Sequence, residues 1–119
     1  MTNAFYWIFY RKMLRGHLQR AQKAVGEFKD QPEAQAYLQE LEKMASKSYI
    51  RELQSSGQSI DKDKIAHIAA NVKLIEQAAS RNDLSAALNY SRAVLSVLPG
   101  NPTIPLPPPD ESGTEKVKL

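Results

Sequence analysis

Hydrophobic residues recur three and four positions apart over most of the first 99 residues of the chain. This spacing places them on one face of an α-helix, which turns by about 100° per residue. Four segments carry such a face, at residues 3–29, 32–54, 61–80 and 83–98. The pattern therefore predicts an all-α fold with four amphipathic helices.

The residues between these segments are typical of helix ends. Pro32 suits the first turn of a helix and rarely lies inside one, so a new helix is expected to begin there. The run of serine and glycine at residues 55–59 predicts a turn, after which Asp61 or Asp63 would cap the third helix. Asp83 is expected to cap the fourth helix in the same way, by accepting hydrogen bonds from free backbone amides.

Short connections make consecutive helices pack as antiparallel hairpins, so residues 1–99 are predicted to form a four-helix bundle of two such hairpins. Residues 100–119 are predicted to be a disordered, proline-rich tail. Together with Pro99 they hold six of the seven prolines. Four of these recur every third residue, the repeat of a polyproline II helix. The tail is either a stiff linker or a ligand for an aromatic groove of the SH3 or WW kind, and the acidic pair Asp110 and Glu111 beside it favours the linker.

The start of the first helix does not fit a helix that buries one face. Five of the nine aromatic residues lie at positions 5–10, and some of them fall on the basic side of the helix. Complete burial of side chains this large stabilises by roughly 1.5–3 kcal/mol each, so they need a second contact. Another segment of the chain, a second copy, a partner protein or a membrane surface could supply it. The apolar residues concerned are Phe5, Ile8 and Phe9, and the neighbouring basic residues are Arg11, Lys12 and Arg15.

Composition is that of an ordinary soluble globular domain, with 42% hydrophobic and 24% charged residues. The absence of cysteine excludes disulfides and thiolate metal sites, which agrees with a reducing compartment and leads us to expect a cytoplasmic protein. The longest apolar run, residues 4–10, is far shorter than the roughly 20 residues that span a bilayer.

The net charge of +3 is unevenly distributed. Residues 1–29 carry six basic residues and one acidic residue, a net charge of +5, whereas residues 30–57 sum to −2. The basicity therefore belongs to the first helix. It favours an acidic protein, nucleic acid or an anionic membrane without choosing between them.

Reactive side chains do not gather in any recognisable pattern. His17 and His67 lie on different predicted helices, and His17 falls on the apolar stripe, where a hydrogen-bonded core or interface histidine is expected. The acids at 61 and 63 lack the glycine and the distant glutamate of a calcium loop, and no glycine-rich phosphate loop exists. We therefore expect a protein that is not an enzyme and has no metal site and no cofactor.

Residues 65–99 resemble a single tetratricopeptide repeat. Residues 83–99 are similar to the second helix and closing proline of that repeat, and Leu74 and Ala87 stand where the repeat has a leucine and an alanine. The later alanine is displaced by one position, to Ala93. The resemblance implies a tight helical hairpin and the binding of a peptide or protein, although roughly three tandem repeats are needed for a stable superhelix.

These observations favour a small helical interaction protein, such as an adaptor, chaperone or regulatory subunit. Its partner would be another protein or a second copy of the chain. Two alternatives use the same helix, as an interfacial membrane anchor or as a nucleic-acid-binding element. The partner-binding residues expected are Phe5, Ile8, Phe9, Arg11, Lys12 and Arg15.

Overall fold

A computed structural model describes residues 2–56 and 60–100, with side chains from residue 9 onward. Within these ranges the chain is entirely helical and contains no strand, which confirms the predicted all-α fold. There are five α-helices where four were predicted. In chain order they are α1 (Thr2–Val25), α2 (Pro32–Met44), α3 (Lys47–Ser55), α4 (Lys62–Ser80) and α5 (Leu84–Ser96), and a short 3-10 turn, η1 (Gly26–Phe28), follows α1.

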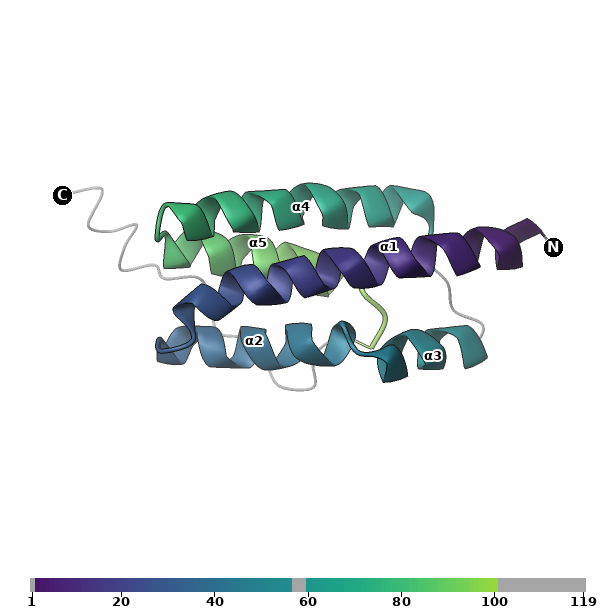
Figure 1. The fold of residues 1–119 in the computed structure, drawn as a ribbon, viewed down its shortest axis with the longest axis horizontal. Coiled ribbons are helices and arrows are strands. Elements are labelled where there is room, and N and C mark those ends of the chain that lie inside the picture. The colour runs from purple at the N-terminus through teal and green to yellow at the C-terminus, as the bar shows by residue number, and fades with distance from the viewer. Residues whose placement is uncertain (1, 57–59, 101–119) are drawn as a thin grey trace.

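The helices pack as two antiparallel pairs that lie side by side (Figure 1). One pair is α1 with α2, and the other is α4 with α5. Helix α1 contacts α4, and α2 contacts α5, so each pair covers the apolar face of the other. Helix α3 continues roughly along the direction of α2, beside the N-terminal half of α1 (Figure 1). The first turns of α1 extend beyond the neighbouring helices.

The single helix predicted over residues 32–54 is wrong, because the chain breaks between α2 and α3. Ser46 adopts an extended conformation (φ −78°, ψ 155°). Its hydroxyl donates to the carbonyl oxygen of Lys43 at 2.7 Å and accepts from the backbone amide of Tyr49 at 3.2 Å. One side chain therefore caps the end of α2 and the start of α3, a competition with the helical backbone that is characteristic of serine.

The other helix ends follow the sequence closely. The carboxylate of Asp61 accepts from the amide of Lys64 at 2.9 Å, and that of Asp83 accepts from the amide of Ala86 at 3.1 Å. Asp61 rather than Asp63 is thus the cap of α4, and the predicted cap of α5 is confirmed. Asn82 takes a left-handed conformation (φ 58°) in the tight turn between them, which asparagine tolerates better than most residues.

One continuous core joins both helix pairs. Two polar side chains lie within it: the Ser91 hydroxyl donates to the carbonyl of Ala87 at 2.7 Å, and the Glu40 carboxylate lies 3.3 Å from the Lys43 ammonium. The largest apolar side chains that are completely buried are Leu14, Leu18, Val25, Tyr37, Leu41, Met44, Ile68, Val72, Ile75, Val94, Leu95 and Leu98.

The chain is tied to α3 where the described part ends. The Tyr49 hydroxyl donates to the carbonyl oxygen of Pro99 at 2.7 Å, which anchors the segment after α5 against α3. Residues 101–119, most of the predicted tail, lie outside the described residues. None of the helices described is both long enough and apolar enough to cross a membrane.

Candidate interaction surface on α1 and α3

A groove of about 450 Å³ runs between the N-terminal half of α1 and α3. We call it the basic groove, because five of its nine lining residues are cationic and, among the residues described, no acidic side chain lines it. From α1 it is lined by Arg11, Lys12, Arg15, Gly16 and Gln19, and from α3 by Lys47, Ile50, Arg51 and Gln54.

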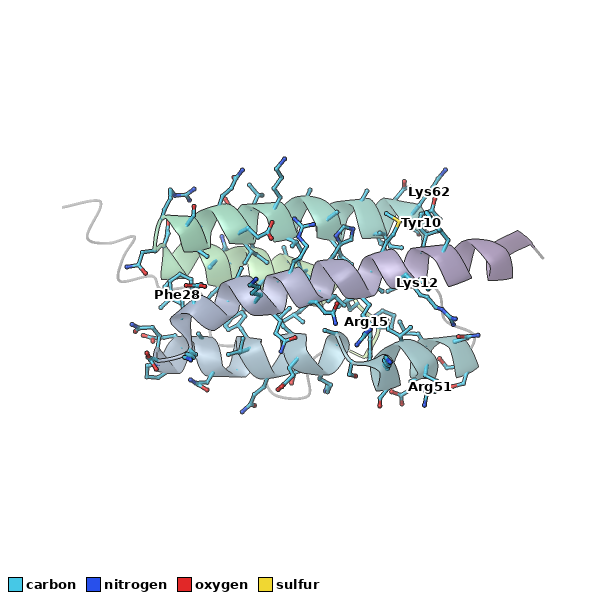
Figure 2. All side chains as sticks on the ribbon, in the orientation of Figure 1. Tyr10, Lys12, Arg15, Phe28, Arg51 and Lys62 are labelled. Atoms are coloured by element: carbon cyan, nitrogen blue, oxygen red, sulfur yellow. The ribbon has the colours of Figure 1, made fainter. Side chains whose placement is uncertain are left out.

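Helical spacing explains why these side chains share the groove. On α1 they lie four residues apart in two adjacent rows, and on α3 they lie three and four apart, so each set occupies one face. Figure 2 shows Lys12 and Arg15 projecting from α1 on the side that faces α3. The break at Ser46 gives α3 its own orientation, in which Tyr49, Ile50 and Leu53 are buried while Arg51 and Lys47 remain exposed.

Two of the arginines are held in place by uncharged partners. The Arg15 Nε donates to the carbonyl oxygen of Ala45 at 2.9 Å, which is one of the free carbonyls at the end of α2. Arg11 donates to the side-chain carbonyl of Gln54 across the groove. Both guanidinium groups therefore keep their full positive charge and part of their hydrogen-bonding capacity.

Across the described part of the chain, none of the five groove cations lies in an ion pair with a carboxylate. The ion pairs that do occur there join Arg20 to Glu76, Lys43 to Glu40 and Arg81 to Asp83. Two other grooves of similar volume differ in this respect: the one between α1 and α2 contains Glu42, and the one between α1 and α4 contains Glu27 and Glu76. Uncompensated positive charge thus distinguishes the basic groove from these two grooves.

The floor of the groove is open at Gly16. Apart from its chain neighbours and the backbone of its own helix, a methyl group added at this position would meet no atom within 4 Å, so open space adjoins the helix here. Ile50, which is 7% exposed, supplies an apolar base beside it. The groove therefore combines an apolar surface with five cationic side chains.

The predicted partner-binding residues divide into two groups. Arg11, Lys12 and Arg15 all line the basic groove. Phe9 lies two residues before Arg11 in the chain and is 63% exposed, the greatest exposure among the large hydrophobic side chains described. The positions of Phe5 and Ile8 fall within α1, but their side chains lie outside the described residues.

Phe9 belongs to a small exposed apolar patch. Its ring packs edge-on against that of Tyr10, with centroids 5.5 Å apart, and Met13 on the next turn is 39% exposed. The aromatic contact holds the Phe9 ring without removing it from solvent. We call Phe9, Tyr10 and Met13 the apolar patch.

Lys47 and Arg51 were not among the predicted partner-binding residues. Their charges disappear in the net charge of −2 over residues 30–57, and the single helix expected there gave no reason to set them beside the first helix. Their four-residue spacing, close after Ser46, is the one signal in the sequence that could have identified a separate basic face.

The two histidines differ from one another in their surroundings. Both ring nitrogens of His17 are buried and have no hydrogen-bond partner within the described chain, so the hydrogen-bonded histidine expected there is not found. Burial lowers the pKa of His17, and the positive charge of Arg20 lowers it further. His67 is exposed and lies 3.3 Å from the Asn71 amide nitrogen. No three His, Cys, Asp or Glu side chains among those described are grouped to hold a metal ion.

The resemblance to a tetratricopeptide repeat is matched by local structure alone. Helices α4 and α5 do form an antiparallel hairpin over the residues concerned, with Ala87 completely buried between them. Comparison of the whole chain with protein-family models, with curated proteins and with solved structures found no significant match.

Proposed function

We propose that this chain is a small, non-enzymatic helical interaction protein, of the adaptor, chaperone or regulatory-subunit kind. It binds a protein partner, or a second copy of itself, through the N-terminal part of α1. The packing of α1 against the other helices holds this part of it in place.

The observation that carries the proposal is the exposure of Phe9. A phenylalanine that leaves 63% of its surface in water, beside a methionine that leaves 39%, forgoes hydrophobic stabilisation that burial would supply. Apolar side chains clustered in this way on the surface of a folded domain mark sites of contact with other molecules. The helix that carries them also projects past its neighbours, so a partner can approach it from several sides (Figure 1).

The basic groove adds arginine to this surface. Arginine and aromatic residues carry much of the binding energy at protein interfaces. Arg11, which lines the groove, follows Phe9 and Tyr10 directly in the chain, so one partner can cover the apolar patch and contact the groove edge together. Charge at the rim of such an interface chiefly speeds association and selects the partner.

Replacement of Phe9 by aspartate tests the proposal. We expect Phe9→Asp to weaken self-association or partner binding by roughly 10-fold or more, because it removes an apolar side chain that the complex would bury and introduces a charge into an apolar contact. Light scattering measures the mass of the intact chain and of the variant, and sedimentation of purified mixtures measures binding to a captured partner. Ala70→Asp, at an exposed position of α4, is the matched control.

A defined oligomer that dissociates with Phe9→Asp and persists with Ala70→Asp identifies the apolar patch as a self-association surface. A monomer whose partner is lost with Phe9→Asp alone identifies it as a surface for a different protein. Equal behaviour of the intact chain and of Phe9→Asp, in both mass and partner binding, contradicts the proposal.

A second candidate function is peripheral membrane association. It is favoured by the tryptophan and tyrosines at positions 5–10, which precede the basic groove directly, since such residues prefer the membrane interface and cations meet anionic headgroups. Flotation with vesicles containing anionic lipid tests it. Protein that stays at the bottom of the gradient at low salt excludes this function.

A further inference from the structure

We propose that the basic groove is a binding site for a small, soluble anion that carries two or more phosphoryl groups. The groove adjoins the apolar patch but shares no residue with it, and the inference is argued from the groove residues alone, so it does not depend on the proposed function. It follows from the charge, the shape and the hydrogen-bonding state of the groove.

The charge of the groove calls for a ligand with several negative charges. Five cations line a volume of about 450 Å³, and an anion bound among them would relieve the repulsion between these like charges. A single carboxylate supplies one negative charge. Two terminal phosphoryl groups supply about three to four in the space of a few atoms, and so balance most of the groove.

The kinds of cation present also suit phosphoryl oxygens. Three of the five are arginines, whose planar guanidinium groups form paired hydrogen bonds with phosphate oxygens. Hydrogen bonds to Ala45 and Gln54 already orient Arg15 and Arg11, which lowers the entropy lost when an anion binds. Lys12 and Lys47 are exposed at the edges, where flexible side chains can close over a ligand.

The shape of the groove favours a compact ligand over a polymer. Its volume lies within the range of small-molecule sites. From Arg11 to Gln19 it spans nine residues of α1, and the eight steps between them cover about 12 Å at the rise of a helix. Single-stranded nucleic acid is usually held by aromatic side chains on which the bases stack, and within the described residues no aromatic side chain lines this groove.

The first experiment titrates sodium tripolyphosphate into the full-length protein at low ionic strength, with isothermal calorimetry and thermal unfolding as readouts. We expect one ligand per chain, a rise in the melting temperature with ligand concentration, and an affinity that falls as salt is added. Absence of binding at millimolar tripolyphosphate overturns the proposal.

Two variant pairs locate the site. Arg51→Glu reverses a charge in the groove, and Lys62→Glu makes the same change of net charge at an exposed position of α4 that lies across the molecule from the groove (Figure 2). We expect Arg51→Glu to weaken binding by about 10-fold or more and Lys62→Glu to change it by less than about 2-fold, because only the former removes a direct contact. Equal effects of the two variants mean that the anion responds to net charge alone, and they overturn the proposal.

Gly16 allows a test that leaves every charge in place. Gly16→Leu places a side chain in the open space of the groove, whereas Gly16→Ala adds only a methyl group that meets nothing. Both changes favour helix formation, so both variants should remain folded, and circular dichroism checks this. We expect Gly16→Leu to abolish binding and Gly16→Ala to retain it. Retention of full affinity by Gly16→Leu overturns the site.

Two further probes distinguish the soluble ligand from larger ones. Phosphatidylcholine vesicles with and without a phosphorylated inositol lipid test a membrane source of the same chemistry. A mixed-sequence single-stranded oligonucleotide tests nucleic acid. Binding of tripolyphosphate that is weakened in Arg51→Glu and lost in Gly16→Leu supports the proposal, whereas binding to vesicles or oligonucleotide without binding to tripolyphosphate contradicts it.

Discussion

His17 shows how a single side chain with buried ring nitrogens can make the stability of this protein depend on pH. Its two ring nitrogens are buried without hydrogen-bond partners in the described chain. The charged groups that act on it are Arg20 on its own helix and Glu76 on α4, of which Arg20 lowers its pKa and Glu76 raises it. Burial has the largest effect, so the pKa of His17 in the folded protein is lower than its usual value.

We expect the free energy of unfolding to decrease as the pH falls below about 6.5, the ordinary pKa of histidine. In this range the unfolded chain binds a proton at residue 17 more readily than the folded chain does, so the stability present above that pH is lost on acidification. Urea unfolding of the intact chain and of His17→Leu at pH 7.5 and pH 5 measures the effect. The variant should lose less stability between the two pH values than the intact chain.

His67→Gln is the matched control, because it changes the exposed histidine of α4. An equal loss of stability in the intact chain and in His17→Leu would show that groups other than His17 cause the pH dependence. The Arg20 and Glu76 pair is the nearest of these, and the hydrogen-bonded guanidinium lowers the pKa of the Glu76 carboxyl.

At the scale of the helices, the break between α2 and α3 is the feature that creates the basic groove. Ser46 hydrogen-bonds to both helices, and Arg15 donates to Ala45 immediately before it. If α2 continued without a break, its helical turn would fix the directions in which Lys47 and Arg51 point. The capped break allows α3 to bury one face and turn its basic face toward α1.

We expect Ser46→Ala to lower the free energy of unfolding by roughly 1 kcal/mol, the typical cost of losing a serine N-cap. It should also loosen the orientation of α3, because alanine favours continuation of the helix. Chemical denaturation measures the stability, and amide hydrogen exchange within α3 measures the local effect. Ser48→Ala, on an exposed side chain in the same helix, is the control, and equal behaviour of the two variants would contradict this role for Ser46.

At the scale of the whole molecule, the two helix pairs share one core. Leu18 of α1 is completely buried, and α1 packs against both α2 and α4. A cavity at this position therefore weakens contacts within one pair and between the two pairs. Both pairs should unfold in one cooperative transition.

We expect Leu18→Ala to lower the free energy of unfolding by about 2–5 kcal/mol, the usual range for truncation of a buried leucine. Amide hydrogen exchange should show lost protection in α5 as well as in α1, because the pairs unfold together. Lys23→Ala, on an exposed part of α1, should change stability by less than about 0.5 kcal/mol. Loss of protection confined to α1 and α2 would show that the two pairs are independent units.

The helical segments could be predicted because their causes are local. The three- and four-residue spacing of apolar side chains, the prolines and the capping aspartates at 61 and 83 act within a turn or two of chain. The break at Ser46 could not be predicted in the same way. Serine is compatible with both a helix interior and a cap, and the apolar spacing continues through it.

The candidate surface was predicted in part for the same reason. The side of α1 that carries Phe9, Arg11, Lys12 and Arg15 follows from the helical period alone. The helical period does not reveal which residues of other helices face that side. Lys47 and Arg51 are more than 30 positions from Arg15 in the chain.

The amino-acid sequence by itself determined that this protein is helical, where most helices begin and end, and that its first helix is basic and aromatic. Only the tertiary structure decided that α3 lies beside that helix, that five cations share one groove, and that the ring nitrogens of His17 are buried without a hydrogen-bond partner among the described residues. Helix formation depends on interactions between near neighbours, which the order of residues specifies directly. The groove depends on how separate helices bury their apolar faces against one another, and this packing is a property of the whole chain.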